Sequence, residues 1–337
     1  MTDPAAAYPP LDQTLRAALR CPACRGALAD MPAGLHCVGD CGAVYDSPAG
    51  GRPDLRLTRP IQRTVTRRLG TPPPRIEDDW LEALKPHPRP AVDFADQAVP
   101  RHLTAEMLSH FPHGDEQAGR ATDDGDAWGG RGGQGLGLDL GCGRAIHRGV
   151  MEAAGWQYAG LDYREAGAPL LGDAHALPFG DAAFGFVLCV AVLEHVRDPR
   201  TVVQEAARVM RPGATLIGTV AFLEPWHDHS YFHHSHLAVI ELLDDAGLVV
   251  RKATPSPGWP VLRAQAKALF PQLPRSVAET AMLPLQGLHR LGHWPLSKLG
   301  KRSERRRQLE TAGAITFIAD KPSPAPPSEP APHGGPG

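Results

Sequence analysis

Residues 136–145 read LGLDLGCGRA, and this stretch decides the fold of the 337-residue chain. Its alternating leucines provide the apolar side of a short strand whose carboxyl end carries Asp139. Gly141 and Gly143 then allow the backbone to turn without a Cβ in the way. A small ligand can approach the main-chain amides at the start of the following helix. Taken alone, the pattern also fits a dinucleotide-binding fold.

Polar residues also follow the next predicted strands. In an open α/β sheet, ligands bind at the carboxyl ends of the strands, so these residues are expected to line one crevice. A carboxylate at the second strand end can accept two hydrogen bonds from ribose hydroxyls. The apolar runs are 136–140, 158–161, 169–172 and 184–192, and the polar residues at their ends are Asp139, Asp162, Asp173, Glu194 and His195.

This region resembles the class I S-adenosylmethionine-dependent methyltransferases, specifically the type 11 group. Five motifs in the right order are far more specific than one glycine loop. The resemblance implies an α/β fold over residues 136–320, a doubly wound, seven-stranded, Rossmann-like sheet with its last strand antiparallel. The matching motifs are LDLGCG (138–143), GLD (160–162), GDAHALPF (172–179), VLEHVRDP (192–199) and RVMRPGATL (208–216).

The resemblance also assigns residues to S-adenosylmethionine. Glycine-turn residues would face its methionine part, Asp162 its ribose, and Asp173 with the Ala174 amide its adenine edge. The full expected set is Asp139, Gly141, Cys142, Gly143, Asp162, Tyr163, Asp173 and Ala174.

Two departures from the family pattern bear on this site. Ala145 stands where a third glycine is usual, and alanine is small enough for a helix start, so cofactor binding should survive. Only ten residues separate Asp162 from Asp173. A crossover with a full helix normally needs at least a dozen residues, so the second helix is expected to be lost or reduced to a turn.

Four cysteines near the N-terminus have the spacing of a structural zinc site. Cys21 and Cys24 form a CPAC knuckle, and Cys37 and Cys41 follow after twelve residues. Residues 42–57 resemble the zinc ribbons that precede many type 11 methyltransferases, in which the tyrosine and a Gly-x-Pro-Asp-Leu element close a small β-structure. The metal would supply much of the folding free energy of so small a module. The alternative is four unligated cysteines in a loop.

A histidine- and aromatic-rich loop follows the fifth predicted strand, within residues 222–236. Three interpretations compete: a second metal site, a general base or substrate-orienting role for His229 or His233, and a solvated loop, which is favoured for most of these histidines. His195 is a candidate for shaping the acceptor pocket, although a structural role at a helix entry is favoured.

The expected organisation is a zinc-ribbon module over residues 1–60, a Pro- and Gly-rich helical or linker region over 61–135, the methyltransferase domain over 136–320, and a disordered tail over 321–337. An insertion at about 255–311 carries apolar helical stretches near 261–269 and 277–291 and should cap the crevice. Its basic segment, 298–307, is interpreted as a solvated helix in preference to an anion-binding or nucleic-acid face.

These features predict an enzyme that methylates a small-molecule or glycan-type acceptor. The net charge of −2 argues against a nonspecific grip on nucleic acid. No long apolar stretch or signal peptide is evident, so a cytoplasmic protein without membrane contact is expected, and no specific protein partner is indicated. One alternative is an RNA base methyltransferase with a zinc-ribbon recognition module, since the cysteine spacing also resembles the ribosomal-RNA guanine-N1 enzymes. The other is a non-catalytic cofactor-fold module.

Overall fold

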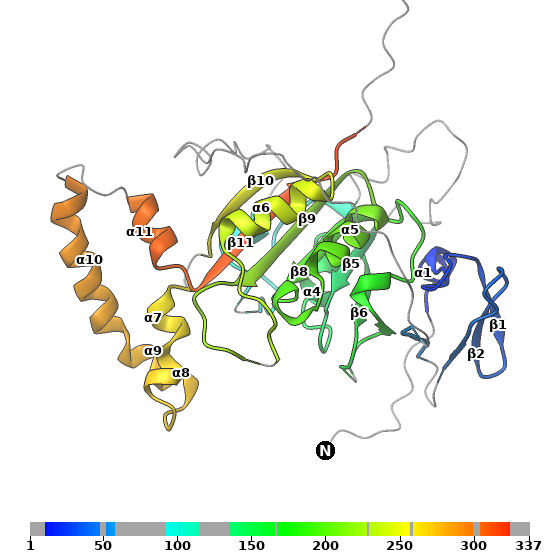
Figure 1. Ribbon diagram of the computed structural model, residues 1–337, viewed down its shortest axis with the longest axis horizontal. Helices are drawn as coiled ribbons and strands as arrows, with labels where there is room; N and C mark the ends of the chain where they lie inside the picture. The colour runs from blue at the N-terminus through cyan, green and yellow to red at the C-terminus, as the bar shows by residue number, and fades with distance from the viewer. Residues whose placement is uncertain are drawn as a thin grey trace, which may run out of the picture.

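A central sheet lies between two smaller units in the computed structural model (Figure 1). The cysteine-bearing module lies at one end of the molecule, and a group of helices from the insertion lies at the other. The residues that the structure describes are 11–47, 52–57, 92–100, 102–114, 135–165, 167–227, 229–256, 259–298 and 304–323.

The sheet has eight strands in the order β10-β11-β9-β8-β5-β6-β7-β4. The last strand, β11, pairs antiparallel with both β10 and β9, whereas the other described pairs of this sheet are parallel, which confirms the predicted antiparallel last strand. The seven strands from β5 onward match the expected sheet, and β4 adds an eighth at the edge. The bounds are β4 Asp54–Leu55, β5 Leu136–Leu140, β6 Gln157–Asp162, β7 Leu170–Gly172, β8 Phe184–Val190, β9 Met210–Ala221, β10 Val249–Pro255 and β11 Ala314–Asp320.

The edge strand β4 differs from the sequence interpretation. Asp54 and Leu55 belong to the Gly-x-Pro-Asp-Leu element, which was expected to close the cysteine module. They pair instead in parallel with Leu171 and Gly172 of β7. The pairing satisfies backbone groups at what would otherwise be the open edge of the sheet. It also joins the N-terminal module to the methyltransferase sheet.

Helices cover both faces of the sheet. On one face lie α5 (Pro199–Val209) and α6 (His236–Asp245), whereas α2 (Ala105–Leu108) and α4 (Arg148–Ala153) lie on the other. Every residue of β8 is buried, as expected for a central parallel strand covered on both faces. Side-chain caps start α5 and α6: Asp198 accepts the Thr201 N–H, and Ser235 accepts the Ala238 N–H. The sequence predicts both starts, because Asp198-Pro199 and Ser235 are typical residues at the beginning of a helix.

The shortened crossover after β6 agrees with the sequence prediction. The described residues between Asp162 and Leu170 contain no helix. The sequence pattern predicts the fifth strand over residues 214–220, after a break at Pro212-Gly213. The strand β9 begins earlier, at Met210, because Met210 pairs with Phe184 of β8. Among the described residues, no helix is both long and apolar enough to cross a membrane.

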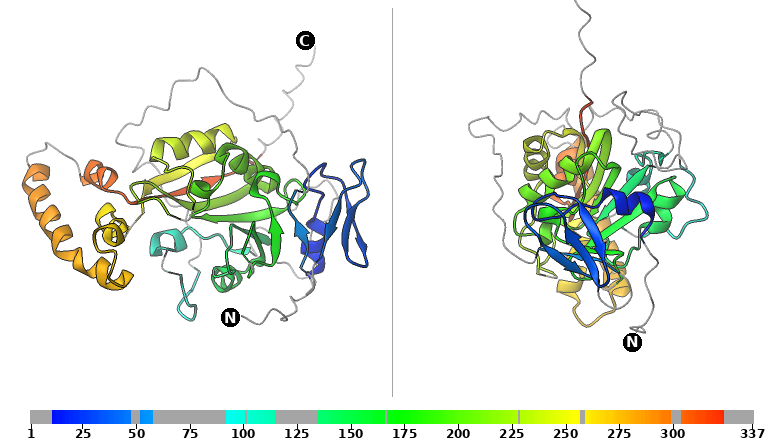
Figure 2. Two further views of the ribbon diagram at one scale, coloured as in Figure 1. Left: turned by 60° about the horizontal axis from the view of Figure 1, so that its bottom comes forward. Right: turned by 90° about the vertical axis from the view of Figure 1, so that its right-hand side faces the viewer.

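The N-terminal module packs directly on the sheet. Its elements are α1 (Gln13–Ala18), β1 (Leu28–Met31), β2 (Gly34–Cys37) and β3 (Val44–Asp46). Buried residues of α1 and β3 belong to the same apolar cluster as the sheet and α5. Leu19 pairs with Phe179, and Arg25 forms an ion pair with the buried Glu205 of α5 at 3.1 Å. The module and the main sheet therefore share one core. Figure 2 shows the module beside the sheet.

The insertion folds into helices, as predicted near 261–269 and 277–291. They extend away from the sheet (Figure 1) and are α7 Val261–Ala264, α8 Ala266–Leu269, α9 Arg275–Ala281, α10 Leu283–Lys298 and α11 Glu304–Glu310. Most of the predicted linker and tail lies outside the described residues, as does part of the basic segment 298–307. The interpretation of those segments stays a prediction.

Candidate functional site

The turn after β5 holds two glycines in backbone conformations that other residues rarely adopt. Gly141 has φ of +70°, and a Cβ added there would come within 2.5 Å of Val192 Cγ2. Gly143 has φ of +52°, and no atom lies within 4 Å of its added Cβ. Ala145, at the third-glycine position, keeps φ of 58° despite its side chain. One glycine is therefore required by packing, whereas the other borders open space.

Asp162, at the end of β6, is fixed beside this turn. Its Oδ2 accepts the Gly143 N–H at 3.1 Å, and its Oδ1 accepts the N–H groups of Arg164 and Glu165 at 2.9 and 3.0 Å. A carboxylate has about four acceptor positions, so one remains for a ligand hydroxyl. Tyr163 beside it is half exposed. This arrangement fits a ribose at the carboxyl edge of the sheet.

Asp139 has buried partners that the sequence analysis did not identify. Its carboxylate is fully buried and lies 3.0 Å from His147 Nδ1, while the Tyr158 hydroxyl donates to Oδ2 at 2.8 Å. His147 Nε2 in turn lies 2.7 Å from His102 Nε2. Desolvation, reinforced by His147, lowers the pKa of His102 to about 4. Asp139 thus joins the end of β5 to His147, just before α4, and to Tyr158 of β6. Its expected contact with a cofactor stays a prediction.

Asp173 directly follows β7, and its carboxylate accepts hydrogen bonds from nearby donors. Its Oδ1 lies 2.9 Å from the His175 backbone nitrogen and 2.7 Å from His175 Nδ1. The Asp198 N–H donates to His175 Nε2, which requires the Nδ1 proton to face Asp173. Ala174 begins the short helix η2 (Ala174–Ala176), and Cys142 is buried in the turn. The predicted cofactor residues therefore cluster along one edge of the sheet.

The next strand end brings three candidate ligand groups together. Glu194 and His195 belong to η3 (Leu193–His195), directly after β8, and His227 comes from the loop after β9. One ligand atom from each lies within 4.8 Å of the others. Burial raises the pKa of the Glu194 carboxyl to about 7. Spacing in the sequence does not pair Glu194 with His227, because the two residues lie more than thirty positions apart.

The two predicted general bases, His229 and His233, have different neighbours in this loop. The His233 ring centroid is 6.0 Å from that of His227, and its Nε2 is 3.4 Å from Ser230 Oγ. His229 adopts φ of 62°, and its ring lies 6.0 Å from the exposed Trp226. The structure therefore brings His195 and His233 toward His227, whereas His229 lies against Trp226.

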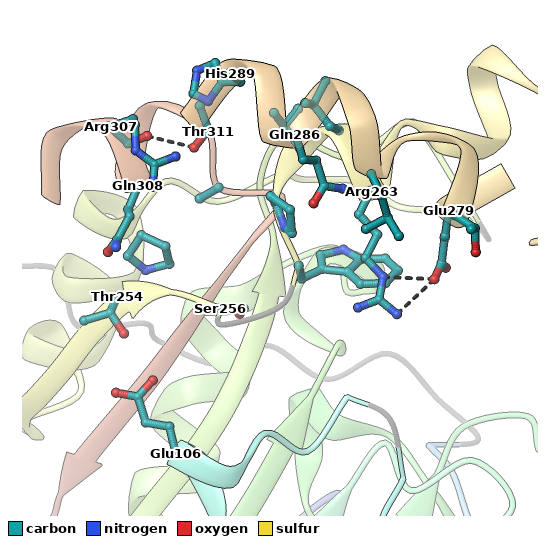
Figure 3. Close-up of a pocket in the computed structure, with 18 of the residues that line it drawn as sticks. Glu106, Thr254, Ser256, Arg263, Glu279, Gln286, His289, Arg307, Gln308 and Thr311 are labelled. Carbon is teal, nitrogen blue, oxygen red and sulfur yellow. Dashed lines mark hydrogen bonds and ion pairs between the residues drawn. The ribbon is translucent and has the colours of Figure 1, made fainter. Parts of the chain in front are cut away.

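A cavity of about 910 Å³ opens between β10, α2 and the insertion helices (Figure 3). Arg263 and Glu279 form an ion pair in its wall, and Gln286 and His289 line it from α10. Trp259, also in the wall, donates to Glu224 at 2.6 Å. Glu224 is 3.9 Å from His227. The cavity is therefore linked to the strand-end cluster through Trp259 and Glu224. The expected capping of the crevice by the insertion stays a prediction.

The four predicted zinc ligands form a compact cluster. One Sγ atom from each of Cys21, Cys24, Cys37 and Cys41 lies within 4.8 Å of the others. Two backbone N–H groups donate to sulfur, from Gly26 to Cys24 and from Gly39 to Cys37, at 3.4 and 3.3 Å. Such N–H···S bonds stabilise thiolates, the form that binds metal. The cluster thus has the donor set of a closed structural zinc site.

Comparisons with known proteins agree with the motifs. Residues 138–218 match the family model described as "Methyltransferase domain". The ubiquinone biosynthesis O-methyltransferase of Idiomarina loihiensis is 30% identical over 96 residues, which are 23% of this chain and 39% of that protein. The enzyme of the same name from Cronobacter sakazakii is 37% identical over 95 residues, 23% of this chain and 38% of that protein. The chain thus spans about two fifths of the length of these relatives.

Two solved structures with low similarity to this chain are a cyclase and a methyltransferase. The [4+2]-cyclase SpnF is 18% identical with a TM-score of 0.38, covering 56% of this chain and 76% of that one. Haemonchus contortus phosphoethanolamine N-methyltransferase 2, in complex with S-adenosyl-L-methionine, is 16% identical with a TM-score of 0.35, covering 56% and 49%. The motifs, the strand order and the family match agree that residues 138–218 form a class I S-adenosylmethionine-dependent methyltransferase domain.

Proposed function

We propose that this protein transfers a methyl group from S-adenosylmethionine to a small-molecule acceptor. The observation that carries the proposal is the glycine turn with open space at Gly143, which Asp162 contacts at 3.1 Å. A nucleoside with a short charged chain fits such a turn, because glycine amides and a carboxylate can both bind it. The sulfonium of the cofactor supplies an activated methyl group and its leaving group.

The acceptor is proposed to bind on the side of the insertion cavity. A volume of about 910 Å³ falls within the range of small-molecule pockets. The wall combines the indole of Trp259 with ion-paired Arg263, which suits an organic molecule with polar substituents. The curated relatives are named as O-methyltransferases, and this favours a hydroxyl acceptor. Most of the rate would come from positioning the acceptor oxygen in line with the methyl group.

The protein's own residues would orient the reactants and exclude water. Asp162 would hold the ribose, and the Asp173 end of β7 would hold the adenine edge. A hydroxyl acceptor must lose its proton as its oxygen bonds to the methyl carbon. Of the two predicted bases, His233 is proposed to accept this proton, because its ring lies 6.0 Å from that of His227. The four cysteines are proposed to hold a structural zinc ion, with no part in methyl transfer.

Cofactor binding provides the first test. Calorimetric titration of S-adenosylhomocysteine should give micromolar affinity, and Asp162→Ala should weaken binding by about 10-fold or more, since charged hydrogen bonds are lost. The matched control is Asp244→Ala, because Asp244 is exposed near the end of α6, at the opposite edge of the sheet. A folded, zinc-loaded protein that binds no cofactor would refute the proposal.

The acceptor class is tested by methyl transfer. With tritiated cofactor, label should appear in low-molecular-mass hydroxylated acceptors and be absent from total RNA. Transfer to RNA alone would replace the small-molecule proposal with the RNA alternative.

A further inference from the structure

We propose that Glu194, His195 and His227 form a binding site for a divalent transition-metal cation. Its placement beside the acceptor rests on the proposed function, whereas binding of the cation does not. The site is distinct from the cysteine cluster in donor chemistry and in position. One carboxylate and two imidazoles are the donors of open metal sites, which retain a position for a further oxygen ligand.

The Glu194 carboxylate supplies the main argument. Its side chain is 1% exposed, and Oε1 accepts the Ala221 N–H at 3.2 Å. The other oxygen, Oε2, is buried without a hydrogen-bond partner. Burying an unpaired carboxylate oxygen is strongly unfavourable unless a cation or a proton compensates it. A bound cation would satisfy this oxygen where the described protein groups do not.

The histidine loop is held against this carboxylate by backbone hydrogen bonds. The carbonyl of Glu194 accepts the N–H groups of Tyr231 and Phe232 at 2.6 and 3.2 Å. The His234 N–H donates to the Ala221 carbonyl at 2.8 Å, at the end of β9. These bonds tie residues 231–234 to the strand tips. The Ser230 N–H in turn donates to the His227 carbonyl at 2.8 Å, which links His227 to the segment held against Glu194.

The His227 ring has the environment of a metal ligand. Its Nδ1 lies 3.0 Å from the Pro225 carbonyl oxygen, an acceptor, so Nδ1 carries the proton and donates. The lone pair is then on Nε2. Metal-binding histidines commonly donate their second ring nitrogen to such a carbonyl. The His195 and His227 rings meet edge to face, with centroids 5.2 Å apart. Glu224, 3.9 Å from His227, adds negative charge nearby.

The cation would act on the acceptor hydroxyl in the proposed reaction. An oxygen bound to a divalent cation loses its proton more readily. The oxygen then forms a bond to the methyl carbon as the S–C bond breaks and its electron pair returns to sulfur. The proton passes to solvent or a nearby base. Methyl transfer thus needs no other reactant.

Manganese binding tests the site without cofactor or acceptor. Mn²⁺ is titrated into protein that carries one equivalent of zinc and is followed by electron paramagnetic resonance, because the thiolate cluster selects the zinc ion and not Mn²⁺. About one Mn²⁺ per chain should bind. Glu194→Gln and His227→Gln should each weaken binding by about 10-fold or more, the effect of disturbing a metal shell. His233→Gln, in the same loop, is the matched control and should leave the affinity unchanged.

Two outcomes would overturn the proposal: no Mn²⁺ binding above that of the Glu194→Gln/His227→Gln double variant, or equal affinity in all variants. Because Glu194 is buried, circular dichroism first confirms that its variant is folded, and the more exposed His227 provides an independent variant. Mn²⁺ binding without methyl transfer would refute the proposed function alone. Methyl transfer that persists at full rate in both ligand variants would refute the catalytic placement alone.

Discussion

The two turn glycines should respond differently to alanine, although both have positive φ. A residue other than glycine in the left-handed region costs about 1–2 kcal/mol. At Gly141 the new Cβ also overlaps Val192 Cγ2, at 2.5 Å, and overpacking of a core adds about 1–3 kcal/mol. Gly141→Ala should therefore lower the free energy of unfolding by about 2–5 kcal/mol. Gly143→Ala meets no atom within 4 Å and should cost only the backbone contribution.

Urea denaturation followed by circular dichroism measures this difference. With the slope of the transition unchanged, the two midpoints report the two free energies of unfolding. Adding Val192→Ala to Gly141→Ala removes the overlap, so the two substitutions should be less destabilising together than the sum of each alone. Gly143→Ala should also weaken S-adenosylhomocysteine binding, because its methyl group enters the proposed cofactor space. Equal destabilisation by both alanines, or additivity with Val192→Ala, would refute the reasoning.

Two further predictions concern the metal and pH. Removal of zinc with a chelator under reducing conditions should lower the unfolding temperature of the whole chain, because the cysteine module shares its core with the sheet. Added zinc should restore the unfolding temperature. A Cys21→Ser variant that unfolds at the same temperature as the zinc-loaded wild type would contradict this. The pKa of His102 is depressed to about 4 in the folded protein, so as pH falls this imidazole takes up a proton near pH 6.5 in the unfolded chain, before it does so in the folded chain. The free energy of unfolding should therefore fall by about 1–2 kcal/mol as pH decreases from 6.5 to 4. The ring's partial exposure keeps the effect below that of full burial. His102→Gln should flatten the dependence in thermal melts, and identical pH profiles would contradict the assignment.

Most of the fold could be predicted from patterns among residues that are close together in the sequence. The apolar run before Gly141 and the cap residues Asp198 and Ser235 act within a few neighbouring residues, and the strand and helices that they predict are present. The missing helix after Asp162 followed from chain length alone, because ten residues are too few for a helix with two loops. The eighth strand was not predicted, because a two-residue strand has no periodicity to detect.

The candidate site was predictable only in part. Asp162 and Asp173 follow apolar runs and lie at the expected edge, since parallel strands place their ends together. The partners of Asp139 were missed because the sequence around a buried histidine or tyrosine does not indicate which group accepts its hydrogen bond. Glu194 was placed at a strand end, but its relation to the histidine loop could not be inferred.

The sequence by itself determined the cofactor class, the order of the methyltransferase strands and the four-cysteine donor set. Each depends on residues close together in the chain, where spacing sets geometry. The tertiary structure alone decided that β4 joins the main sheet, that His147 and Tyr158 enclose Asp139, and that His227 meets Glu194. These contacts join segments that are distant in the chain, and they form only when the loops and the shared core bring those segments together. The physical reason is that burial and long-range hydrogen bonding, unlike helix or strand periodicity, depend on which surfaces finally meet.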